Sequence, residues 1–214
     1  MKRFVIGLVI AAVVAVVGFG AWWWLELRWR PTEITQSRAE IERMLEQSGW
    51  VAPGLNGPKL YMVSFRSCPE CIEYETQEFP ALHQAGVDTR VTMFPLRERN
   101  GIEQSTTFER ATVAELWLSQ HREWPLLERW FDTRPPSAWT APGIQSADTD
   151  GARRAVVEGS RAFAERLSTL LQQNGVREGW PVMVWRTRDG ALHACACTNP
   201  KQWANIRREL IEER

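Results

Sequence analysis

The chain begins with a long apolar segment. Two cations, Lys2 and Arg3, precede an uncharged and mostly apolar run from Phe4 to Leu25, which ends in three consecutive Trp. As a helix, a run of this length spans the roughly 30 Å hydrocarbon core of a bilayer, and Trp favours the membrane–water interface. We therefore expect residues 1–30 to form an uncleaved transmembrane anchor. A cleaved signal peptide is the alternative, although "VVGFGA" is a poor cleavage site.

The next segment has the pattern of a short amphipathic helix and a linker. Apolar side chains recur at helical spacing, between charged residues, in "ITQSRAEIERMLEQS". Gly and Pro then interrupt the pattern in "GWVAPGLNGP". We expect residues 31–57 to be a juxtamembrane helix and a linker, and the globular domain to cover residues 58–214.

The domain opens with a strand, a helix and a second strand. The apolar stretch "KLYMVSF" at 59–65 has the β-branched and aromatic residues of a buried strand. An amphipathic helix is predicted over 71–86, with Pro80 as a kink or near its end and Gly86 as its cap. The second strand is predicted over 87–96. This order predicts a right-handed crossover between parallel strands.

The rest of the domain is a helical block followed by a hairpin and a helix. Residues of about 100–175 have mainly helical spacing, apart from a Pro-rich irregular stretch at 132–151. Two strands are predicted at 180–187 and 192–197, because "RDG" between them is a hairpin signal. The chain ends in a predicted helix over 199–214. The fold class is therefore α/β.

Charge and cysteine content limit the function and the compartment. The 26 Lys and Arg balance the 26 Asp and Glu, so no basic excess favours binding to nucleic acid. Four cysteines in two close pairs suit an oxidising compartment. The positive charges before the apolar run favour a cytoplasmic amino terminus. We expect a single-pass protein of the bacterial inner membrane with its domain in the periplasm.

The first cysteine pair, Cys68 and Cys71, lies between a predicted strand and a predicted helix in "FRSCPECIEYE". The start of a helix stabilises a thiolate, which is the nucleophile in disulfide exchange. We expect Cys68 to be the nucleophile and Cys71, one turn later, to be the resolving thiol. Glu70 should oppose thiolate formation by like charge, and Arg66 should partly offset it. Two structural cysteines or half of a metal site are the alternatives.

The second pair, Cys195 and Cys197, lies two residues apart on the last predicted strand, so both should share a face. They are expected near the mouth of the first pair. Three interpretations stay open: an auxiliary redox pair, ligands of a zinc or copper site formed with Cys68 and Cys71, or core thiols without function. His193 shares their face and is a candidate third ligand.

The order of elements resembles the thioredoxin fold with the helical insertion of the bacterial periplasmic Dsb oxidoreductases. The likeness is closest to the catalytic domain of the disulfide isomerases of that family. It is carried by "FRSCPECIEYE", "AGVDTRVTMFPLRE", "AELWLSQ" and "NGVREGWPVMVWRTRDGALH". The chain departs from the family in three ways. The apolar segment and short helix replace a dimerisation domain, Trp180 precedes Pro181, and the second cysteine pair is additional.

The resemblance implies an enzyme that reduces or isomerises protein disulfides through its Cys-x-x-Cys pair. It implies no cofactor besides this redox-active disulfide, and it implies that Pro181 is a cis-proline that shapes the substrate groove. Protein disulfides would be the substrates, and a membrane thiol protein would be the electron donor. A metal-handling protein is the competing function. An anchored interaction module with an inactive Cys pair is a third.

Overall fold

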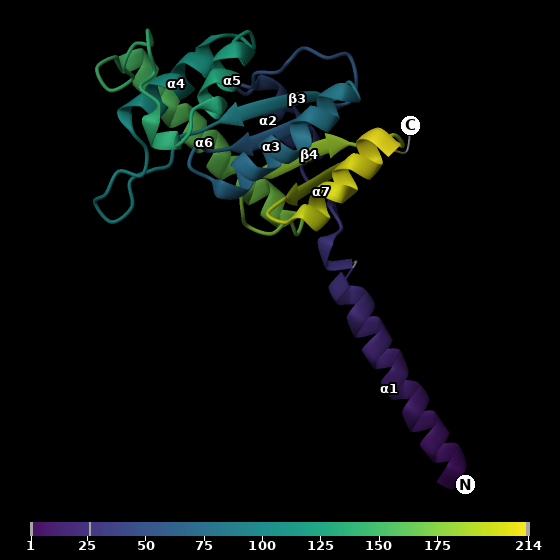
Figure 1. Ribbon diagram of the computed structural model, residues 1–214. Helices are drawn as coiled ribbons and strands as arrows, with labels where there is room; N and C mark the ends of the chain where they lie inside the picture. The colour runs from purple at the N-terminus through teal and green to yellow at the C-terminus, as the bar shows by residue number, and fades with distance from the viewer. Residues whose placement is uncertain (1, 26, 213–214) are drawn as a thin grey trace. The chain divides into compact units, whose positions relative to one another are not determined.

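The computed structural model describes the backbone of residues 2–25 and 27–212, and it leaves out the side chains of residues 2–11, 21, 25 and 27. The chain divides into two units, one up to Arg30 and one from Pro31 onward. The first unit contains α1 (Lys2–Leu25) and the 3-10 turn η1 (Leu27–Trp29) (Figure 1).

A search of the described residues finds no helix with both the length and the apolar character needed to cross a bilayer. The anchor predicted within residues 1–30 is therefore not supported. Of the apolar run that suggested it, side chains are described only at residues 12–20 and 22–24. The rest of the predicted span lies outside the described side chains.

The second unit is built on one mixed sheet with the strand order β1-β5-β4-β2-β3. The strands are β1 (Thr32–Glu33), β2 (Lys59–Ser64), β3 (Asp88–Met93), β4 (Val182–Arg186) and β5 (Leu192–Ala196). β2 and β3 are parallel, as their connection through a helix predicts, and every other neighbouring pair is antiparallel. β4 and β5 form the hairpin that the "RDG" turn predicts.

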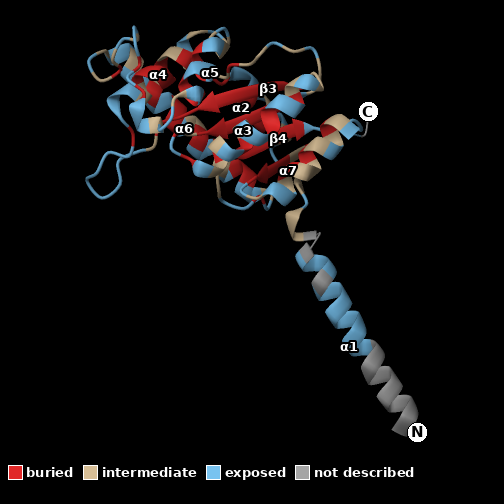
Figure 2. Ribbon diagram, viewed as in Figure 1, coloured by how far each residue is buried: buried red, intermediate tan, exposed pale blue. Residues whose placement is uncertain are grey.

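Helices cover both faces of this sheet, and its strands are almost entirely buried (Figure 2). α3 (Pro69–Gln84) and α7 (Pro200–Arg207) contribute to one core, which contains Met62, Met183 and both cysteine pairs. α2 (Arg38–Gln47) and α6 (Gly151–Gln173) contribute to the other core. The strand residues of this core alternate with those of the first and point to the opposite face of the sheet. The chain ends in a π-helical segment, Arg208–Glu212.

The domain begins earlier than residue 58, where the sequence analysis placed it. β1 pairs with β5, and Ile41 and Leu45 of α2 are fully buried against the sheet. Residues 31–57 therefore belong to the second unit and are not a separate linker. The reason is hydrophobic: the apolar stripe of α2 covers a sheet face that would otherwise be exposed to water.

The helical insertion lies between β3 and β4. It consists of α4 (Thr107–Leu118), α5 (Trp124–Asp132), the 3-10 turn η2 (Pro136–Ala138) and α6. A capping box at Thr106 and Glu109 starts α4, since each side chain bonds the backbone N–H of the other residue. The insertion places the end of α5 close to the loop that carries the first cysteine pair.

Candidate functional site

Cys68 and Cys71 form a disulfide at the amino terminus of α3, with 5.2 Å between their Cα atoms. Cys68 is the N-cap of this helix, and its Sγ accepts a hydrogen bond of 3.1 Å from the backbone N–H of Cys71. Pro69 occupies the first helical position, where its missing N–H costs nothing. The N–H donor and the positive end of the helix dipole both stabilise an anion on Cys68.

The pair is almost enclosed in this oxidised state. Cys68 is 1% exposed and Cys71 is 4% exposed. Another molecule can therefore reach the Cys68 sulfur only after the neighbouring side chains move. Cys71 lies one turn further along α3, and its sulfur is bonded to that of Cys68.

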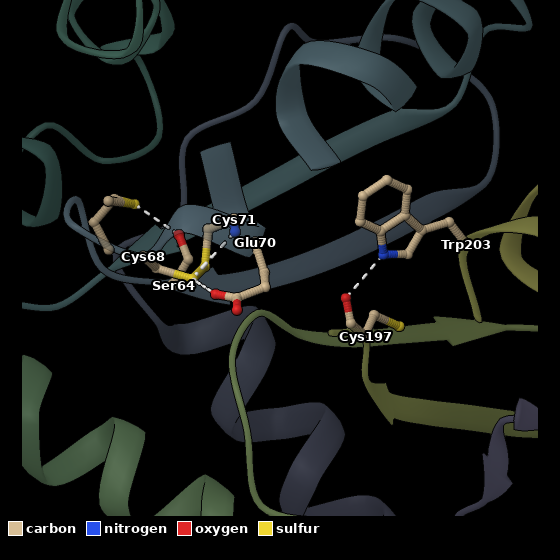
Figure 3. Close-up of a disulfide and its surroundings, with 7 residues drawn as sticks. Ser64, Cys68, Glu70, Cys71, Cys197 and Trp203 are labelled. Atoms are coloured by element: carbon tan, nitrogen blue, oxygen red, sulfur yellow. Dashed lines mark hydrogen bonds between the residues drawn. A yellow bond between two sulfur atoms is a disulfide. The ribbon is translucent and has the colours of Figure 1, made fainter. Parts of the chain in front are cut away.

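Glu70 lies beside the Cys68 sulfur, as its place in the motif predicts. Its Oε2 is 3.9 Å from Cys68 Sγ (Figure 3). A carboxylate at this distance repels a thiolate, so the geometry has the sign that the sequence analysis assigned to Glu70.

Arg66 points away from the cysteines. Its Nη2 donates hydrogen bonds to the carbonyl oxygens of Trp130, Phe131 and Thr133, at 2.9, 3.2 and 2.7 Å. These carbonyls end α5, where the helix dipole is negative. Burial, together with the charge of Arg134, lowers the pKa of Arg66 to about 10. These hydrogen bonds join the loop that carries Cys68 to the helical insertion. The effect of Arg66 on the Cys68 thiolate stays a prediction.

The peptide bond between Trp180 and Pro181 is cis. The strand that follows pairs with β2 and places Val182 opposite Val63, close to the end of β2 that leads to the cysteine pair. The indole of Trp180 packs on Phe94, with 4.7 Å between the ring centroids. Trp180 also lines a cavity of about 380 Å³ together with Leu96 and α6. The bulky residue therefore forms one wall of a groove beside Pro181.

Cys195 and Cys197 are also joined by a disulfide, and they are 4% and 0% exposed. Both face the core that contains Cys68 and Cys71, so the predicted shared face is correct. The backbone N–H of Cys197 donates a 2.8 Å hydrogen bond to the carbonyl oxygen of Pro181. The second pair therefore lies at the same end of the sheet as the first.

The two pairs are nonetheless separate. β4 lies between β5 and β2 in the sheet, and a separation of two strands is about 10 Å. Figure 3 shows Cys197 apart from the first pair and next to Trp203, whose Nε1 donates to the Cys197 carbonyl oxygen at 2.8 Å. Within the described part of the chain, no three His, Cys, Asp or Glu side chains lie close enough to hold a metal ion. The four-thiol site is therefore not assembled.

His193 shares the face of Cys195 and Cys197 but has a different partner. Its Nδ1 lies 2.8 Å from Oε2 of Glu209, and this hydrogen bond raises the pKa of His193 despite partial burial. The same carboxylate oxygen accepts from Nε1 of Trp185 at 2.7 Å. The pairing with Glu209, rather than metal ligation, therefore accounts for the position of the His193 ring.

The sequence analysis overlooked Glu75. This residue lies on α3 one turn after Cys71, and its Oε2 is buried without a hydrogen-bond partner in the described structure. Burial raises the pKa of Glu75 to about 7, against the opposing effect of Arg134 and Arg66. The spacing of four residues from Cys71 was the only signal in the sequence that could have pointed to it.

Comparison with known proteins shows the fold. No protein-family model matches the chain, and no curated protein matches its sequence. Among solved structures, a linker-deletion mutant of Proteus mirabilis ScsC matches 100% of this chain and 96% of its own length, with a TM-score of 0.52 and 14% identity. The catalytic domain of Proteus mirabilis ScsC matches 81% of this chain and 97% of its own length, with a TM-score of 0.51 and 12% identity.

These two likenesses agree with the strand order, the cysteine pair that begins α3 and the insertion between β3 and β4. The chain therefore has the fold of these two structures, a thioredoxin-like fold with a helical insertion.

Proposed function

We propose that this protein is a thiol–disulfide oxidoreductase that acts on protein disulfides. The observation that carries the proposal is the Cys68–Cys71 disulfide at the start of α3, with the Cys71 N–H directed at the Cys68 sulfur. The thioredoxin-like fold supports the proposal, because the strand after Pro181 pairs with the strand that leads to Cys68.

The chemistry consists of two exchange steps. In the reduced protein, the Cys68 thiolate attacks one sulfur of a substrate disulfide and forms a mixed disulfide, while the other substrate sulfur leaves as a thiolate. Cys71 then attacks the Cys68 sulfur, which restores the Cys68–Cys71 disulfide and releases the second substrate thiol. Two electrons pass from the protein to the substrate.

Reduction or isomerisation is the direction we favour over net disulfide formation. A strong oxidant requires a very stable thiolate, and the Glu70 carboxylate, 3.9 Å from the Cys68 sulfur, opposes one. A reductase that turns over needs a thiol protein as electron donor, and a membrane thiol protein is the donor class we propose. The periplasm is the compartment we propose, since two disulfides persist best in an oxidising environment.

Cys195 and Cys197 are proposed to be an auxiliary redox pair. Supporting this role, they form a second disulfide, face the same core as the first pair and lie at the same end of the sheet. A dithiol at one pair and a disulfide at the other can exchange two electrons and two protons. Because the pairs are about two strands apart, direct exchange requires that Cys197 and the loop before α3 approach each other.

The decisive experiment is a redox titration of the full chain. The protein is equilibrated without oxygen in glutathione buffers of graded potential, free thiols are alkylated, and modified cysteines are counted by mass spectrometry. A two-thiol transition at Cys68 and Cys71 supports the oxidoreductase, and its midpoint gives the direction. A second transition that shifts when Cys68 and Cys71 are both replaced by Ser supports the auxiliary pair.

Two results would contradict the proposal. Cysteines that stay oxidised throughout the series would make both disulfides structural. Stoichiometric metal in the reduced protein, released by alkylation, would favour the metal-handling alternative.

A further inference from the structure

We propose that the domain has a second binding site, at the end of the sheet away from the cysteine pairs, which takes a small organic anion with an apolar body. The site is a cleft of about 670 Å³ between α2, the hairpin of β4 and β5, and the π-helical segment Arg208–Glu212. We call it the α2 cleft. The proposed disulfide exchange does not use it, so this inference is independent of the proposed function.

The α2 cleft is distant from the disulfide of α3. Its lining includes Lys59, the first residue of β2, and Arg186, the last residue of β4. The cysteine pair follows Ser64 at the other end of β2, and a strand of this length spans about 17 Å. A small molecule in the cleft would therefore not contact Cys68 or Cys71.

The size and the floor of the cleft suit a small molecule. Ligand sites in proteins commonly have volumes of about 300–1,000 Å³ and mostly apolar walls. Five large side chains, all mostly buried, form the floor: Leu45, Tyr61, Trp185, Leu192 and Leu210. They belong to both cores, so the cleft crosses the end of the sheet. An aromatic or aliphatic group bound on this floor would be removed from water, which favours binding.

The acidic side chains of the cleft already have partners within the protein. Glu42 is paired with Arg186, and Glu46 is paired with Lys59 at 2.9 Å. Glu209 is held by the indole and the imidazole described above. These carboxylates are therefore neutralised by the protein's own groups and leave little negative charge to attract a cationic ligand.

Two cations of the cleft have no such partner. Arg43 on α2 and Arg188 in the turn between β4 and β5 make neither a hydrogen bond nor an ion pair within the described part of the chain. The turn is held against α2, because Nη2 of Arg38 donates to the carbonyl oxygen of Gly190. The two guanidinium groups are thus kept on the lining of one cleft, and their charge favours an anion there.

Together, these features select the chemistry of the ligand. The floor favours a ring or a short aliphatic chain. The guanidinium groups favour a carboxylate or a sulfonate, which a guanidinium can bind through two parallel N–H donors. A neutral molecule of the same shape gains only the apolar contact. An aromatic carboxylate should therefore bind more tightly than the corresponding amide.

The test is an NMR titration of the full chain, labelled with heavy nitrogen in its tryptophans. The indole N–H of Trp185 lies at the cleft, and Trp185→Phe identifies its signal. Phenylpropionate is the anionic probe, and phenylpropionamide is the neutral probe of the same shape. Affinities are taken from the shift of the Trp185 signal. They are compared among the wild type, Arg43→Gln, Arg188→Gln, the double variant, and Arg177→Gln, which removes an exposed arginine outside the cleft.

We expect phenylpropionate to move the Trp185 signal and the amide to bind at least about fivefold more weakly. Arg43→Gln and Arg188→Gln should each weaken the carboxylate by up to about fivefold, the upper range for an exposed charge pair, and the double variant should weaken it further. Arg177→Gln should bind as the wild type does.

Three results would overturn the proposal. A Trp185 signal that neither probe moves would show that the cleft binds no such molecule. Equal affinity for the acid and the amide, or wild-type affinity in the double variant, would show that the two arginines do not recognise an anion. Equal weakening in Arg177→Gln and in the cleft variants would reduce the effect to the net charge of the protein. None of these results bears on the disulfide exchange at Cys68 and Cys71.

Discussion

Removal of the Glu70 charge should make the protein a stronger oxidant. Glu70 Oε2 lies 3.9 Å from the Cys68 sulfur, which carries the negative charge in the reduced protein and none in the disulfide. Coulomb's law at that distance gives about 1 kcal/mol of repulsion with the dielectric constant of water and about 4 kcal/mol at an effective value of 20. Glu70 is partly exposed, so the lower value applies.

Glu70→Gln keeps the shape and removes this repulsion, which stabilises the reduced form by about 1 kcal/mol. For a two-electron couple, where 30 mV corresponds to 1.4 kcal/mol, the reduction potential should rise by about 20 mV. Glu70→His should raise it further, because a protonated imidazole attracts the thiolate. The assay is the glutathione titration of the Cys68–Cys71 pair at neutral pH, with Glu73→Gln as the exposed control. An unchanged or lower potential in Glu70→Gln would refute the electrostatic argument.

Three further predictions concern stability. Burial raises the pKa of Glu46, but hydrogen bonds from Tyr61 and Lys59 and the charge of Arg90 outweigh it and bring the pKa from 4.5 to about 2. The ionised form therefore stabilises the fold above pH of about 4.5, and thermal melts should show that the Tm loss in Glu46→Gln disappears as the pH falls toward 2. Arg66→Met should lower the free energy of unfolding by about 2 kcal/mol in urea titrations, because three carbonyls at the end of α5 lose a charged donor and that of Phe131 has no other donor among the described residues. Arg66→Lys should recover part of this loss, and equal stability of Arg66→Met and wild type would contradict the stabilising role of these hydrogen bonds. Trp203→Phe should cost about 1–3 kcal/mol, since the buried Cys197 carbonyl oxygen loses its indole donor, and a neutral effect on urea unfolding would contradict this.

Under the proposed function, the groove lined by Trp180, the residue before Pro181, would influence which substrates bind. Its apolar wall includes Phe94, Leu96 and Trp180, and charged side chains of Arg97, Glu165 and Glu178 lie at its rim. Phe94 and Leu96 contribute to the core on the sheet face opposite the cysteine pairs, whereas Trp180 packs against both cores. A substrate chain that passes Pro181 would therefore meet a mixed surface, and the indole would set its width.

The local elements of this domain could be predicted from the sequence, because each depends on a short pattern. The strand before Cys68 is visible as a continuous apolar stretch, and the helix after it as helical spacing of apolar residues; the parallel strand follows them in the expected order. Parity along the last strand correctly placed Cys195 and Cys197 on one face. The position of Cys68 at a helix start, and with it the candidate chemistry, follows from the same patterns.

The long-range partners were decided only by the tertiary structure. Arg66 bonds carbonyls more than 60 residues away, at the end of α5, because the insertion folds back on the active-site loop. The pairing of β1 with β5 and the burial of α2 brought residues 31–57 into the domain. The strand order, with β4 between β5 and β2, decided how far apart the two cysteine pairs lie.

Glu75 illustrates the physical reason for this division. Its sequence spacing from Cys71 is local and was available from the start, but an exposed glutamate at that position would be an ordinary surface residue. Burial between α3 and the insertion changes its pKa and leaves its carboxylate oxygen without a partner. The sequence by itself therefore determined which side chains share a helix face or a strand face, since backbone geometry is local. Desolvation and contacts between distant segments arise only when the chain packs, and they determined which of those side chains can do chemistry.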